Sequence, residues 1–266
     1  MTYVHGYSDT EQQRLVAQAA YWRDELILPG LGYMPGERVL EIGCAAGATL
    51  AVIASAVPAI ELAGIDLEPR QIEFARRHLA SRGCPDADLR VGSAERLPWP
   101  DAHFDHVFVM WLLEHLHDPR PVLAEARRVL VPGGTIVVIE TDYASFTTYP
   151  ESEDYEYLRR AQYDLFAANG NPIIGRILAM RLDGAGFHHV HSQVRGFHFC
   201  QQAGSDELRR HVDYVCGFLE PEIPRMVELL GRDRERLDAG LRFLRSLPAR
   251  REAAFTQIVY RASGRK

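Results

Sequence analysis

The sequence lacks several features that would assign it to a broad class of protein. It contains no apolar run of roughly 18 residues, the length that a helix needs to cross a bilayer, so no membrane insertion is expected. Residues 1–15 show no basic segment followed by an apolar stretch, so no secretory signal is visible and a cytoplasmic location is expected. No internal repeat or low-complexity stretch is present.

The sequence also lacks an excess of basic charge and a pairing pattern among its cysteines. The formal net charge is −6, so no overall basic field draws the protein to nucleic acid, which is not an expected partner. The four cysteines show no CxxC spacing, which favours buried reduced thiols over disulfides or a metal site: Cys44, Cys84, Cys200 and Cys216. No metal is therefore expected, and a homo-oligomer stays open.

The composition is that of an ordinary globular α/β protein. Hydrophobic residues make up 47% of the chain and charged residues 25%, enough apolar material for a sizeable core. The length of 266 residues suits one domain over 1–266 with accessory elements better than two small domains.

From position 38 to 139, short apolar runs alternate with helical periodicity. Several runs are apolar at every residue, as in a parallel sheet that helices cover on both faces; they predict strands at 39–42, 62–65, 89–91, 107–110 and 136–139. The segments between them predict helices at 50–57, 69–82 and 121–130. Repeated βαβ units imply a doubly wound, Rossmann-like sheet with its ligand crevice beyond the carboxyl ends of the strands.

The rest of the chain predicts two more strands and a helical cover. Strands at 190–200 and 254–262 would complete a mainly parallel seven-stranded sheet with an antiparallel edge strand. An amphipathic helix at 9–28 is expected to pack across the crevice. Three segments would then form the cover: 1–28 as an N-terminal lid, and 144–172 and 203–250 as helical insertions over the substrate.

The segment VLEIGCAAGATL is the most informative one. A buried strand ends at Gly43, the chain turns through Ala45 and Gly47, and a helix follows; small residues there let the backbone approach a ligand closely. The loop lacks the second and third glycines of a dinucleotide motif, and Glu41 would oppose phosphates. A sulfonium cofactor with an α-amino group fits better. Asp66, at the end of the second strand, suits the ribose of either cofactor, or a helix N-cap.

Five consecutive motifs carry a family resemblance. E-x-G-x-A-x-G, the acidic residue of GIDLEP, VGSAERLPWPD, WLLEHLHDP and LVPGGTIVV resemble, in order and spacing, the motifs of class I S-adenosylmethionine-dependent methyltransferases. The match covers residues 38–140 and is to the small-molecule branch that includes ubiquinone- and menaquinone-type enzymes. Each motif is weak alone, whereas five in sequence are specific.

The resemblance implies S-adenosyl-L-methionine as cofactor, S-adenosyl-L-homocysteine as product and a role for each matching residue. The methionine part of the cofactor would be held by Glu41, Gly43, Ala45 and Gly47, with Tyr7 near its carboxylate. Asp66 would bind the ribose, Leu67 would pack on the adenine, and the Ala94 N–H would donate to an adenine nitrogen. The site would be completed by Ser93, Glu95 and Met110. Ser93 stands where such enzymes carry an aspartate, which weakens the contact to the adenine amino group. Ala45 replaces a glycine, which is tolerable only if its φ stays negative.

The residues for catalysis are harder to assign from the sequence. Methyl transfer chiefly requires alignment, and a base is needed only if the acceptor must lose a proton. His115 and Asp142 follow strands that end at the crevice, and His5 and Tyr7 lie in the predicted lid; each has packing, capping or anchoring as its alternative role. Glu114 is expected to be a surface charge, and Tyr143 to line the acceptor site.

Two charged groups are expected to lie on the surface. His188, His189 and His191 alternate along a strand without an acidic partner at ligand spacing, so an edge-strand surface role is favoured over a metal site. Residues 231–252 hold seven arginines against four acids, which indicates a solvated helix face more than a nucleic-acid footprint.

These observations predict transfer of a methyl group to a small hydrophobic or aromatic acceptor, on O, N or C. Tyrosines and phenylalanines gather in the first insertion, which favours such an acceptor over a macromolecule. An RNA or protein methyltransferase, a nicotinamide-dependent oxidoreductase and a non-catalytic cofactor-binding module remain as alternatives.

Overall fold

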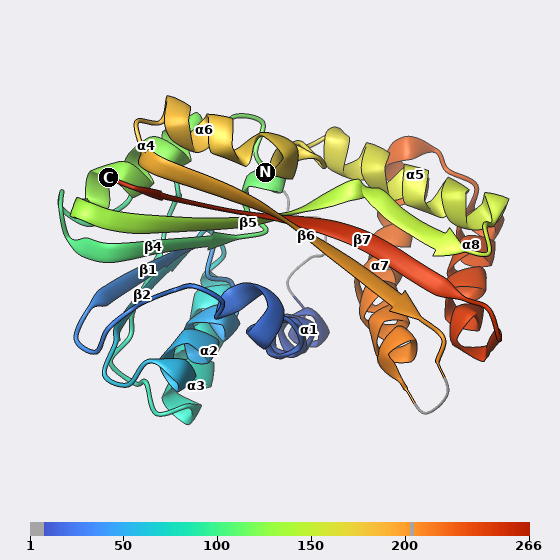
Figure 1. The fold of residues 1–266 in the computed structure, drawn as a ribbon, viewed down its shortest axis with the longest axis horizontal. Helices are drawn as coiled ribbons and strands as arrows, with labels where there is room; N and C mark the ends of the chain where they lie inside the picture. The colour runs from blue at the N-terminus through green and yellow to red at the C-terminus, as the bar shows by residue number, and fades with distance from the viewer. Residues whose placement is uncertain (1–7, 203–204) are drawn as a thin grey trace.

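The computed structural model describes residues 8–202 and 205–266. Its strands form one seven-stranded sheet in the order β3-β2-β1-β4-β5-β7-β6, with helices on both faces (Figure 1). The strands are β1 (Arg38–Ile42), β2 (Glu61–Asp66), β3 (Asp88–Val91), β4 (Phe104–Met110), β5 (Leu130–Tyr149), β6 (His188–Cys200) and β7 (Ala254–Arg265). The predicted mainly parallel, doubly wound sheet is confirmed.

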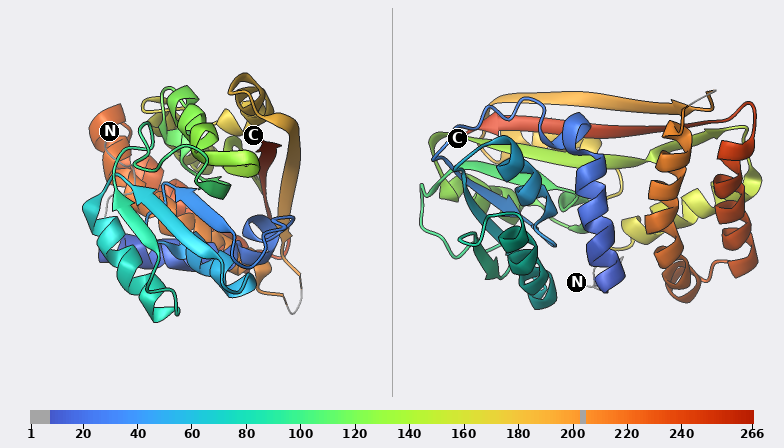
Figure 2. Two further views of the ribbon diagram at one scale, coloured as in Figure 1. Left: turned by 90° about the vertical axis from the view of Figure 1, so that its left-hand side faces the viewer. Right: turned by 90° about the horizontal axis from the view of Figure 1, so that it is seen from below.

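The helices form two layers and a cap. They are α1 (Asp9–Tyr21), the π-helical turn η1 (Arg23–Ile27), α2 (Ala48–Ala56), α3 (Pro69–Ser81), the 3-10 turn η2 (Leu113–His115), α4 (Arg120–Val129), α5 (Glu153–Ala167), η3 (Ile174–Ile177), α6 (Leu178–Gly184), α7 (Glu207–Leu230), α8 (Arg234–Ser246) and η4 (Leu247–Ala249). Helices α2 and α3 cover one face of the sheet, and α4 and α6 cover the other (Figure 1). Helix α1 lies between α2 and α7 in a row of helices that Figure 2 shows from below.

The antiparallel strand is β7, and it lies one place in from the edge. Strand β7 pairs antiparallel with β5 on one side and with β6 on the other, so β6 forms the edge. Strand β6 runs parallel to β5 and lies one strand position away from it. The last strand, β7, fills that position and pairs with both. As predicted, the edge strand is largely exposed and carries His188, His189 and His191.

Strand β5 is longer than the sequence predicts, and the first insertion is shorter. The strand runs from Leu130 to Tyr149, so residues 144–149 are extended and the prediction of helical cover from 144 is wrong there. The physical reason is β7, which continues past the core and pairs with residues 147–149 after an irregularity beyond Asp142. Helix α5 begins at Glu153, where the Ser152 hydroxyl accepts the N–H of Tyr155 as an N-cap.

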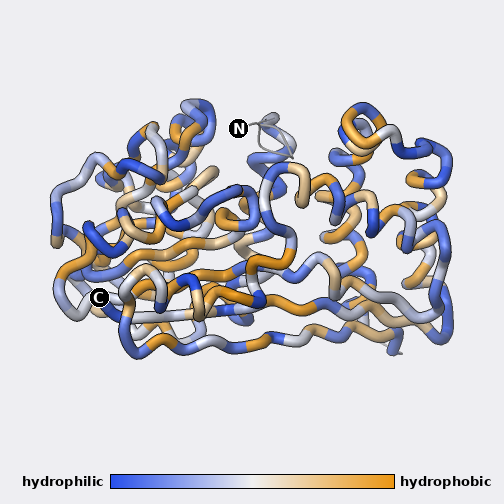
Figure 3. The backbone as a smooth tube through the Cα atoms, turned by 90° about the horizontal axis from the view of Figure 1, so that it is seen from above, coloured by the Kyte–Doolittle hydropathy of each residue, from blue (hydrophilic) through white to orange (hydrophobic). Residues whose placement is uncertain are grey.

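The extended strands carry the cap, which we define as α5, α7, α8 and the distal ends of β5 and β7. Its buried side chains form a hydrophobic cluster of their own, distinct from the clusters on the two faces of the sheet. Figure 1 shows the cap beyond the α2–α3 half of the molecule, on the same long strands. Hydrophobic residues run along the central strands, and hydrophilic ones mark the outer turns (Figure 3). In the described part of the chain, no helix combines the length and apolarity that a membrane crossing requires.

Candidate functional site

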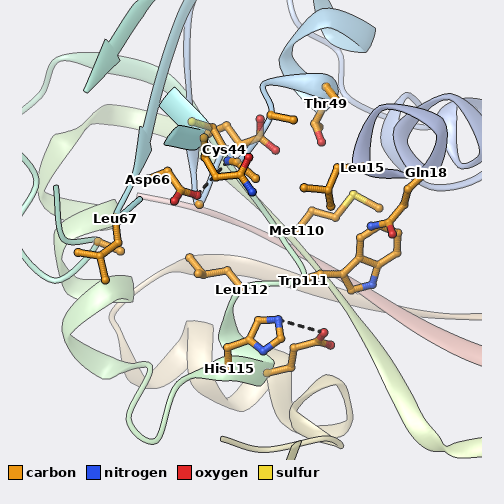
Figure 4. A pocket seen from close by; sticks show the side chains of 18 of the residues that line it. Leu15, Gln18, Cys44, Thr49, Asp66, Leu67, Met110, Trp111, Leu112 and His115 are labelled. Atoms are coloured by element: carbon orange, nitrogen blue, oxygen red, sulfur yellow. Dashed lines mark hydrogen bonds and ion pairs between the residues drawn. The ribbon is translucent and has the colours of Figure 1, made fainter. Parts of the chain in front are cut away.

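A cavity of about 380 Å³ opens at the carboxyl ends of β1, β2, β4 and β5. Its two parts have different linings. One part, the crevice, is lined by the loop after β1 and by the ends of β2 and β4, at Glu41, Gly43, Cys44, Ala45, Asp66, Leu67, Ser93, Ala94, Glu95 and Met110. The other part, the chamber, is lined from α1, η2, β5, the turn after α5, α7 and β7, at Leu15, Gln18, Ala19, Glu114, His115, Tyr143, Phe146, Asn169, Tyr214, Phe218 and Gln257. Figure 4 shows Asp66 and Leu67 on one side and Gln18 and Trp111 on the other.

The loop after β1 adopts left-handed backbone conformations at three small residues. Gly43, Ala45 and Gly47 have φ values of 76°, 42° and 67°. The N–H groups of Gly43 and Cys44 both donate to the Ile65 carbonyl, at 2.9 and 3.0 Å, which ties the loop to β2. The loop therefore presents its backbone to the crevice at close range.

The expectation that φ stays negative at Ala45 is wrong. The Ala45 N–H donates to Asp66 Oδ2 at 3.0 Å, and this bond holds the residue in the left-handed region. Gly47 does not line the cavity: it precedes α2, and an added Cβ would lie 3.1 Å from Ala75 on α3. Its small size serves the packing of α2 on α3.

Asp66 occupies the predicted position at the end of β2. Its Oδ2 accepts the Ala45 N–H and its Oδ1 accepts the Glu68 N–H at 3.0 Å, so each oxygen keeps a further lone pair for a ligand. Burial raises the pKa of this carboxyl, although the two backbone bonds act in the opposite direction. The geometry suits a carboxylate that accepts two hydroxyl groups from a sugar.

Glu41 is a buried carboxyl group without a cation in the described structure. It is 3% exposed, and its Oε2 has no hydrogen-bond partner among the described residues. Burial raises the pKa of Glu41 to about 8, and the negative charge of Asp66 adds to the effect. A ligand with an ammonium or sulfonium charge would stabilise the ionised form, so this orphaned oxygen fits the predicted cationic end of the cofactor.

The far end of the crevice is open and partly apolar. Leu67 is 60% exposed, an apolar side chain that a flat ring system would cover. Ser93 Oγ accepts the Glu95 N–H at 3.2 Å, and Ala94 lies between them in the lining. Met110 forms part of the floor and is buried.

The predicted surface position of Glu114 is wrong. It was expected on the surface, yet it is 2% exposed and lines the chamber. The Tyr143 hydroxyl donates to Glu114 Oε1 at 2.8 Å, and His115 Nε2 lies 3.7 Å from the same oxygen. No residue of the segment WLLEHL is exposed, because η2 packs between β5 and the residues that follow α5. There the Asn171 N–H donates to the Glu114 carbonyl at 2.9 Å.

His115 lies in the chamber as a neutral imidazole. Burial lowers its pKa to about 4, and its ring packs against Phe166 at a centroid distance of 5.3 Å. A neutral ring can accept or donate a hydrogen bond at physiological pH. Its placement at the chamber wall is the one that the sequence predicts for an acceptor-side residue.

Asp142 is not brought to the cavity. Its carboxylate forms a two-pronged ion pair with Arg176, at 2.7 and 3.1 Å, and accepts the Ala144 N–H at 3.0 Å. Neighbouring residues of a strand point to opposite faces, so Tyr143 reaches the chamber while Asp142 faces η3. The prediction of Asp142 as a catalytic residue therefore loses its geometric basis.

Two predicted residues, His5 and Tyr7, lie outside the described residues. The start of α1 is described: Ser8 Oγ accepts the Glu11 N–H at 3.2 Å, as the N-cap pattern predicts. The same helix places Leu15 and Ala19 in the cavity wall, which confirms that it packs across the crevice.

Sequence reasoning missed several lining residues. Tyr214 and Phe218 come from α7 one helical turn apart, and Gln257 comes from β7. Trp111 was also missed: it has a φ of 52°, and its indole N–H donates to Thr141 Oγ1 at 2.9 Å. A bulky residue with positive φ is strained by about 1–3 kcal/mol, and such strain concentrates at functional sites. The aromatic pair at i, i+4 spacing was the available signal for α7.

The arginine-rich segment and the predicted absence of a metal site concern the surface of the molecule. The arginine-rich segment forms α8, with ion pairs from Arg234 to Asp238 at 2.9 Å and from Arg245 to Glu220 at 2.5 Å. This agrees with the predicted solvated helix face. Among the described residues, no group of three or more His, Cys, Asp or Glu side chains is arranged to hold a metal ion.

Comparisons with known proteins agree with this geometry. A family model described as a methyltransferase domain matches residues 40–138. The chain is 31% identical over 155 residues to the demethylmenaquinone methyltransferase of Renibacterium salmoninarum, which covers 58% of this chain and 62% of that protein. It is 37% identical over 177 residues to an uncharacterized 37.1 kDa protein in transposon TN4556 of Streptomyces fradiae, covering 66% of this chain and 50% of that one. The chain thus spans only part of the length of these relatives.

The fold itself resembles a solved structure over nearly the whole chain. Phosphoethanolamine N-methyltransferase 2 of Haemonchus contortus, in complex with S-adenosyl-L-methionine, superposes with a TM-score of 0.55 at 16% identity, covering 95% of this chain and 52% of that one. Residues 40–138 contain the crevice loop, Asp66, the Ser93–Glu95 turn and η2, the segments that surround the cavity. Through these residues the chain is similar to methyltransferases, in agreement with the S-adenosyl-L-methionine-dependent class that its motifs resemble.

Proposed function

We propose that this chain transfers a methyl group from S-adenosyl-L-methionine to a small acceptor with an apolar or aromatic body. The observation that carries the proposal is that the crevice and the chamber form one cavity. A donor held in the crevice would direct its reacting end toward the chamber. In-line transfer requires that nucleophile, carbon and sulfur align, which a shared cavity can impose.

The crevice supports the donor through three separate contacts. Asp66 offers two oxygens for the ribose, Leu67 offers an apolar surface for the adenine, and the buried Glu41 carboxyl suits the amino group. Proposed contacts of Ser93, Ala94, Glu95 and Met110 with the adenine part follow from their places in the lining. The bound donor supplies an activated methyl group, and the residues of the chain orient it.

The chamber supports a small acceptor over a macromolecule. Its walls are aromatic at Tyr143, Phe146, Tyr214 and Phe218, and α1 and α7 flank it (Figure 2). A buried aromatic chamber excludes water and holds a flat apolar molecule, whereas an RNA or a protein chain would need an open groove. Protein or RNA methylation remains the second candidate function that the assay below tests.

Calorimetry with S-adenosyl-L-homocysteine and turnover with tritiated donor test the proposal. We expect binding in the micromolar range, and label transfer to members of a panel of small aromatic compounds. Asp66→Ala is expected to weaken binding by at least about tenfold, since hydrogen bonds to a charged group contribute about 1.5–3 kcal/mol each. Asp86→Ala, at an exposed turn outside this cavity, is the matched control and should bind normally.

The competing functions predict different results. Label transfer to RNA or protein, with RNA retention that weakens steeply with salt, would favour a macromolecular acceptor. Binding of S-adenosyl-L-homocysteine without any transfer would favour a non-catalytic module. No binding at all would refute the proposal.

A further inference from the structure

Glu114 is a chamber group that binding of the donor does not use. It lies on η2, directly after β4, and is 2% exposed while lining the cavity beside His115 and Tyr143. The dashed line at His115 in Figure 4 marks the contact of its Nε2 with Glu114 Oε1, at 3.7 Å. A buried carboxyl group at an acceptor site needs a physical reason, because ionised groups are costly to bury.

The two oxygens of Glu114 have different surroundings. Oε1 accepts the Tyr143 hydroxyl at 2.8 Å, which fixes the orientation of the carboxyl group. Oε2 is buried and has no hydrogen-bond partner of normal geometry among the described residues, although the Glu140 carboxyl and the Thr141 N–H lie close enough to lower the pKa of Glu114. An unsatisfied buried oxygen costs about 1–3 kcal/mol, so a ligand that brings a hydrogen-bond donor would relieve that cost.

The second carboxyl group of the site, Glu140, lies behind Glu114. It is fully buried on β5, and it accepts the backbone N–H groups of Leu112, Leu113 and Glu114 at 3.2, 2.7 and 3.3 Å. In the described structure no arginine or lysine is among the groups that shift the pKa of either carboxyl group. Two adjacent carboxyl groups without a cation resist double ionisation, so the pair retains a proton.

In this environment the Glu114 carboxyl group gains and loses its proton near physiological pH. Burial raises the pKa of Glu114 to about 7, and burial with the neighbouring charge of Glu114 raises the pKa of Glu140 well above its ordinary range. A general base works best when its pKa lies near the working pH. Tyr143 keeps its proton, because burial raises its pKa, and it therefore remains a donor to Glu114.

We propose that Glu114 is a catalytic residue that takes the proton of a phenolic hydroxyl while the oxygen of that hydroxyl is methylated. This inference rests on the proposed function. The acceptor oxygen forms a bond to the methyl carbon, the carbon–sulfur bond breaks with its electron pair returning to sulfur, and the O–H proton moves to Glu114 Oε2. The donor sulfonium becomes a thioether, Glu114 becomes neutral, and the proton later leaves to solvent.

An amine acceptor fits this arrangement less well. An ionised carboxylate beside an amine would hold it as ammonium, in which the nitrogen lone pair needed for attack is occupied. A hydroxyl oxygen, in contrast, gains nucleophilicity as its proton moves to a base. The aromatic walls at Phe146, Tyr214 and Phe218 suit the ring that makes such a hydroxyl acidic.

A binding experiment tests the recognition half of the proposal without a known acceptor. With S-adenosyl-L-homocysteine saturating, 2-naphthol, its methyl ether and 2-naphthylamine are titrated at pH 7.5. We expect 2-naphthol to bind at least about tenfold tighter than the ether, because only the hydroxyl can donate to Oε2. In Glu114→Gln this preference should vanish, while S-adenosyl-L-homocysteine affinity stays unchanged.

A kinetic experiment tests the proton-transfer half. With a phenol that the wild type methylates, Glu114→Gln should lose about 10²–10⁴-fold in kcat with little change in KM, since the amide keeps its contact with Tyr143 but takes no proton. In the wild type, kcat/KM should rise with pH through the titration of Glu114. Tyr143→Phe removes a bond that lowers the pKa of Glu114 and should move this rise to higher pH. Glu73→Gln, at an exposed position of α3, is the control.

The outcomes separate this inference from the proposed function. Absence of S-adenosyl-L-homocysteine binding refutes the function itself. Three results, each obtained with normal cofactor binding, would overturn the role of Glu114 and leave the proposed function standing. They are equal affinity for 2-naphthol and its ether, methylation of the amine alone, and full turnover in Glu114→Gln.

Discussion

Ala45 holds a backbone conformation that alanine rarely adopts. Its φ is 42°, in the left-handed region, where an L side chain costs about 1–2 kcal/mol. The residue stays there because its N–H donates to Asp66 Oδ2 and because the two preceding residues, Gly43 and Cys44, are both tied to Ile65. The loop thus carries strain at the place where the donor would bind.

Glycine at this position should release the strain. We expect Ala45→Gly to raise the free energy of unfolding by about 0.5–1 kcal/mol, the relief of left-handed strain minus the added entropy of the unfolded chain. Urea denaturation measures it. Ala59→Gly, with a φ of 56° in an exposed turn, should gain a similar amount without affecting cofactor affinity. A destabilised Ala45→Gly protein would show that the turn is not strained.

The Glu41 carboxyl makes cofactor binding depend on pH. Its pKa of about 8 in the free protein means that it is mostly protonated at pH 7, and a cationic ligand would favour the ionised form. Binding should therefore release a proton, and affinity for S-adenosyl-L-methionine should rise several-fold from pH 6.5 to 8. Glu41→Gln should bind about tenfold weaker and lose most of this dependence. Calorimetry in buffers of different ionisation enthalpy measures the released proton directly.

Side-chain direction separates the site residues that the sequence predicts from those that it does not. Asp66 and the crevice loop follow from a strand–turn–helix pattern, because that pattern fixes the backbone as well as the side chains. Glu114 follows β4 by a few residues, and Asp142 lies on β5; at either place a change in side-chain direction decides whether the residue faces the chamber or points away from it. Glu114 is buried against Tyr143, and Asp142 is paired with Arg176. No local pattern in the sequence encodes that difference.

At the scale of elements, the Asp142–Arg176 ion pair joins β5 to η3. The carboxylate is buried, the guanidinium is half-exposed, and the Ala144 N–H adds a third bond. Asp142→Asn should lower the free energy of unfolding by about 1–3 kcal/mol, because it weakens charged hydrogen bonds at a buried atom. Cofactor affinity should not change, since the residue does not line the cavity. Loss of turnover in a protein of unchanged stability would restore Asp142 as a catalytic residue.

The cap depends on a close crossing of α5 and α8 at Gly240. An added Cβ at this position would lie 2.4 Å from the Asp154 carbonyl oxygen and 2.8 Å from Leu158 Cβ, too near for either atom. Gly240→Ala should therefore lower stability by about 1–3 kcal/mol through overpacking. Gly217→Ala on α7 has open space around the new methyl and should raise stability by about 0.5–1 kcal/mol. Thermal and urea unfolding compare the two variants, and equal shifts would contradict the close crossing.

The distal end of β5 is a part of a strand that the sequence does not predict. Apolar runs predict the core of β5, where helices cover both faces of the sheet. Residues 144–149 are extended because β7 pairs with residues 147–149, and that partner lies more than a hundred positions later in the chain. Pairing between strands so far apart is decided by tertiary contacts, whereas the βαβ order from β1 to β5 is decided locally.

On the scale of the whole molecule, the chain combines a sheet core with a helical cap. The core holds residues 40–138, which match the methyltransferase domain, while α1 and α7 supply five of the chamber residues, Leu15, Gln18, Ala19, Tyr214 and Phe218. Packing of these helices, rather than any motif, sets the shape that an acceptor must fit. The sequence therefore predicts most of the residues that line the crevice, and it predicts the chamber only as an aromatic cavity.

Buried carboxyl groups should also make the stability of the whole molecule fall with pH. Between pH 6.5 and 8 the folded chain keeps protons on Glu41 and Glu114, with pKa values of about 8 and 7, which the unfolded chain has already released at its ordinary value of 4.5. The folded state binds more protons, so each rise in pH favours unfolding. His115 and His211, with pKa values lowered to about 4 and 3, act only below pH 6.5, where they make stability rise with pH.

We therefore expect the free energy of unfolding to drop by about 1–3 kcal/mol from pH 6.5 to 8, since one titrating group contributes at most about 1.4 kcal/mol per pH unit. Urea denaturation at both pH values measures the drop. Glu41→Gln should show a smaller drop, and saturating S-adenosyl-L-homocysteine should reduce it in the wild type, because its ammonium group pairs with ionised Glu41. If wild type and Glu41→Gln lose the same stability over this range, Glu41 is already ionised in the free protein, and the proton release on cofactor binding must come from another group.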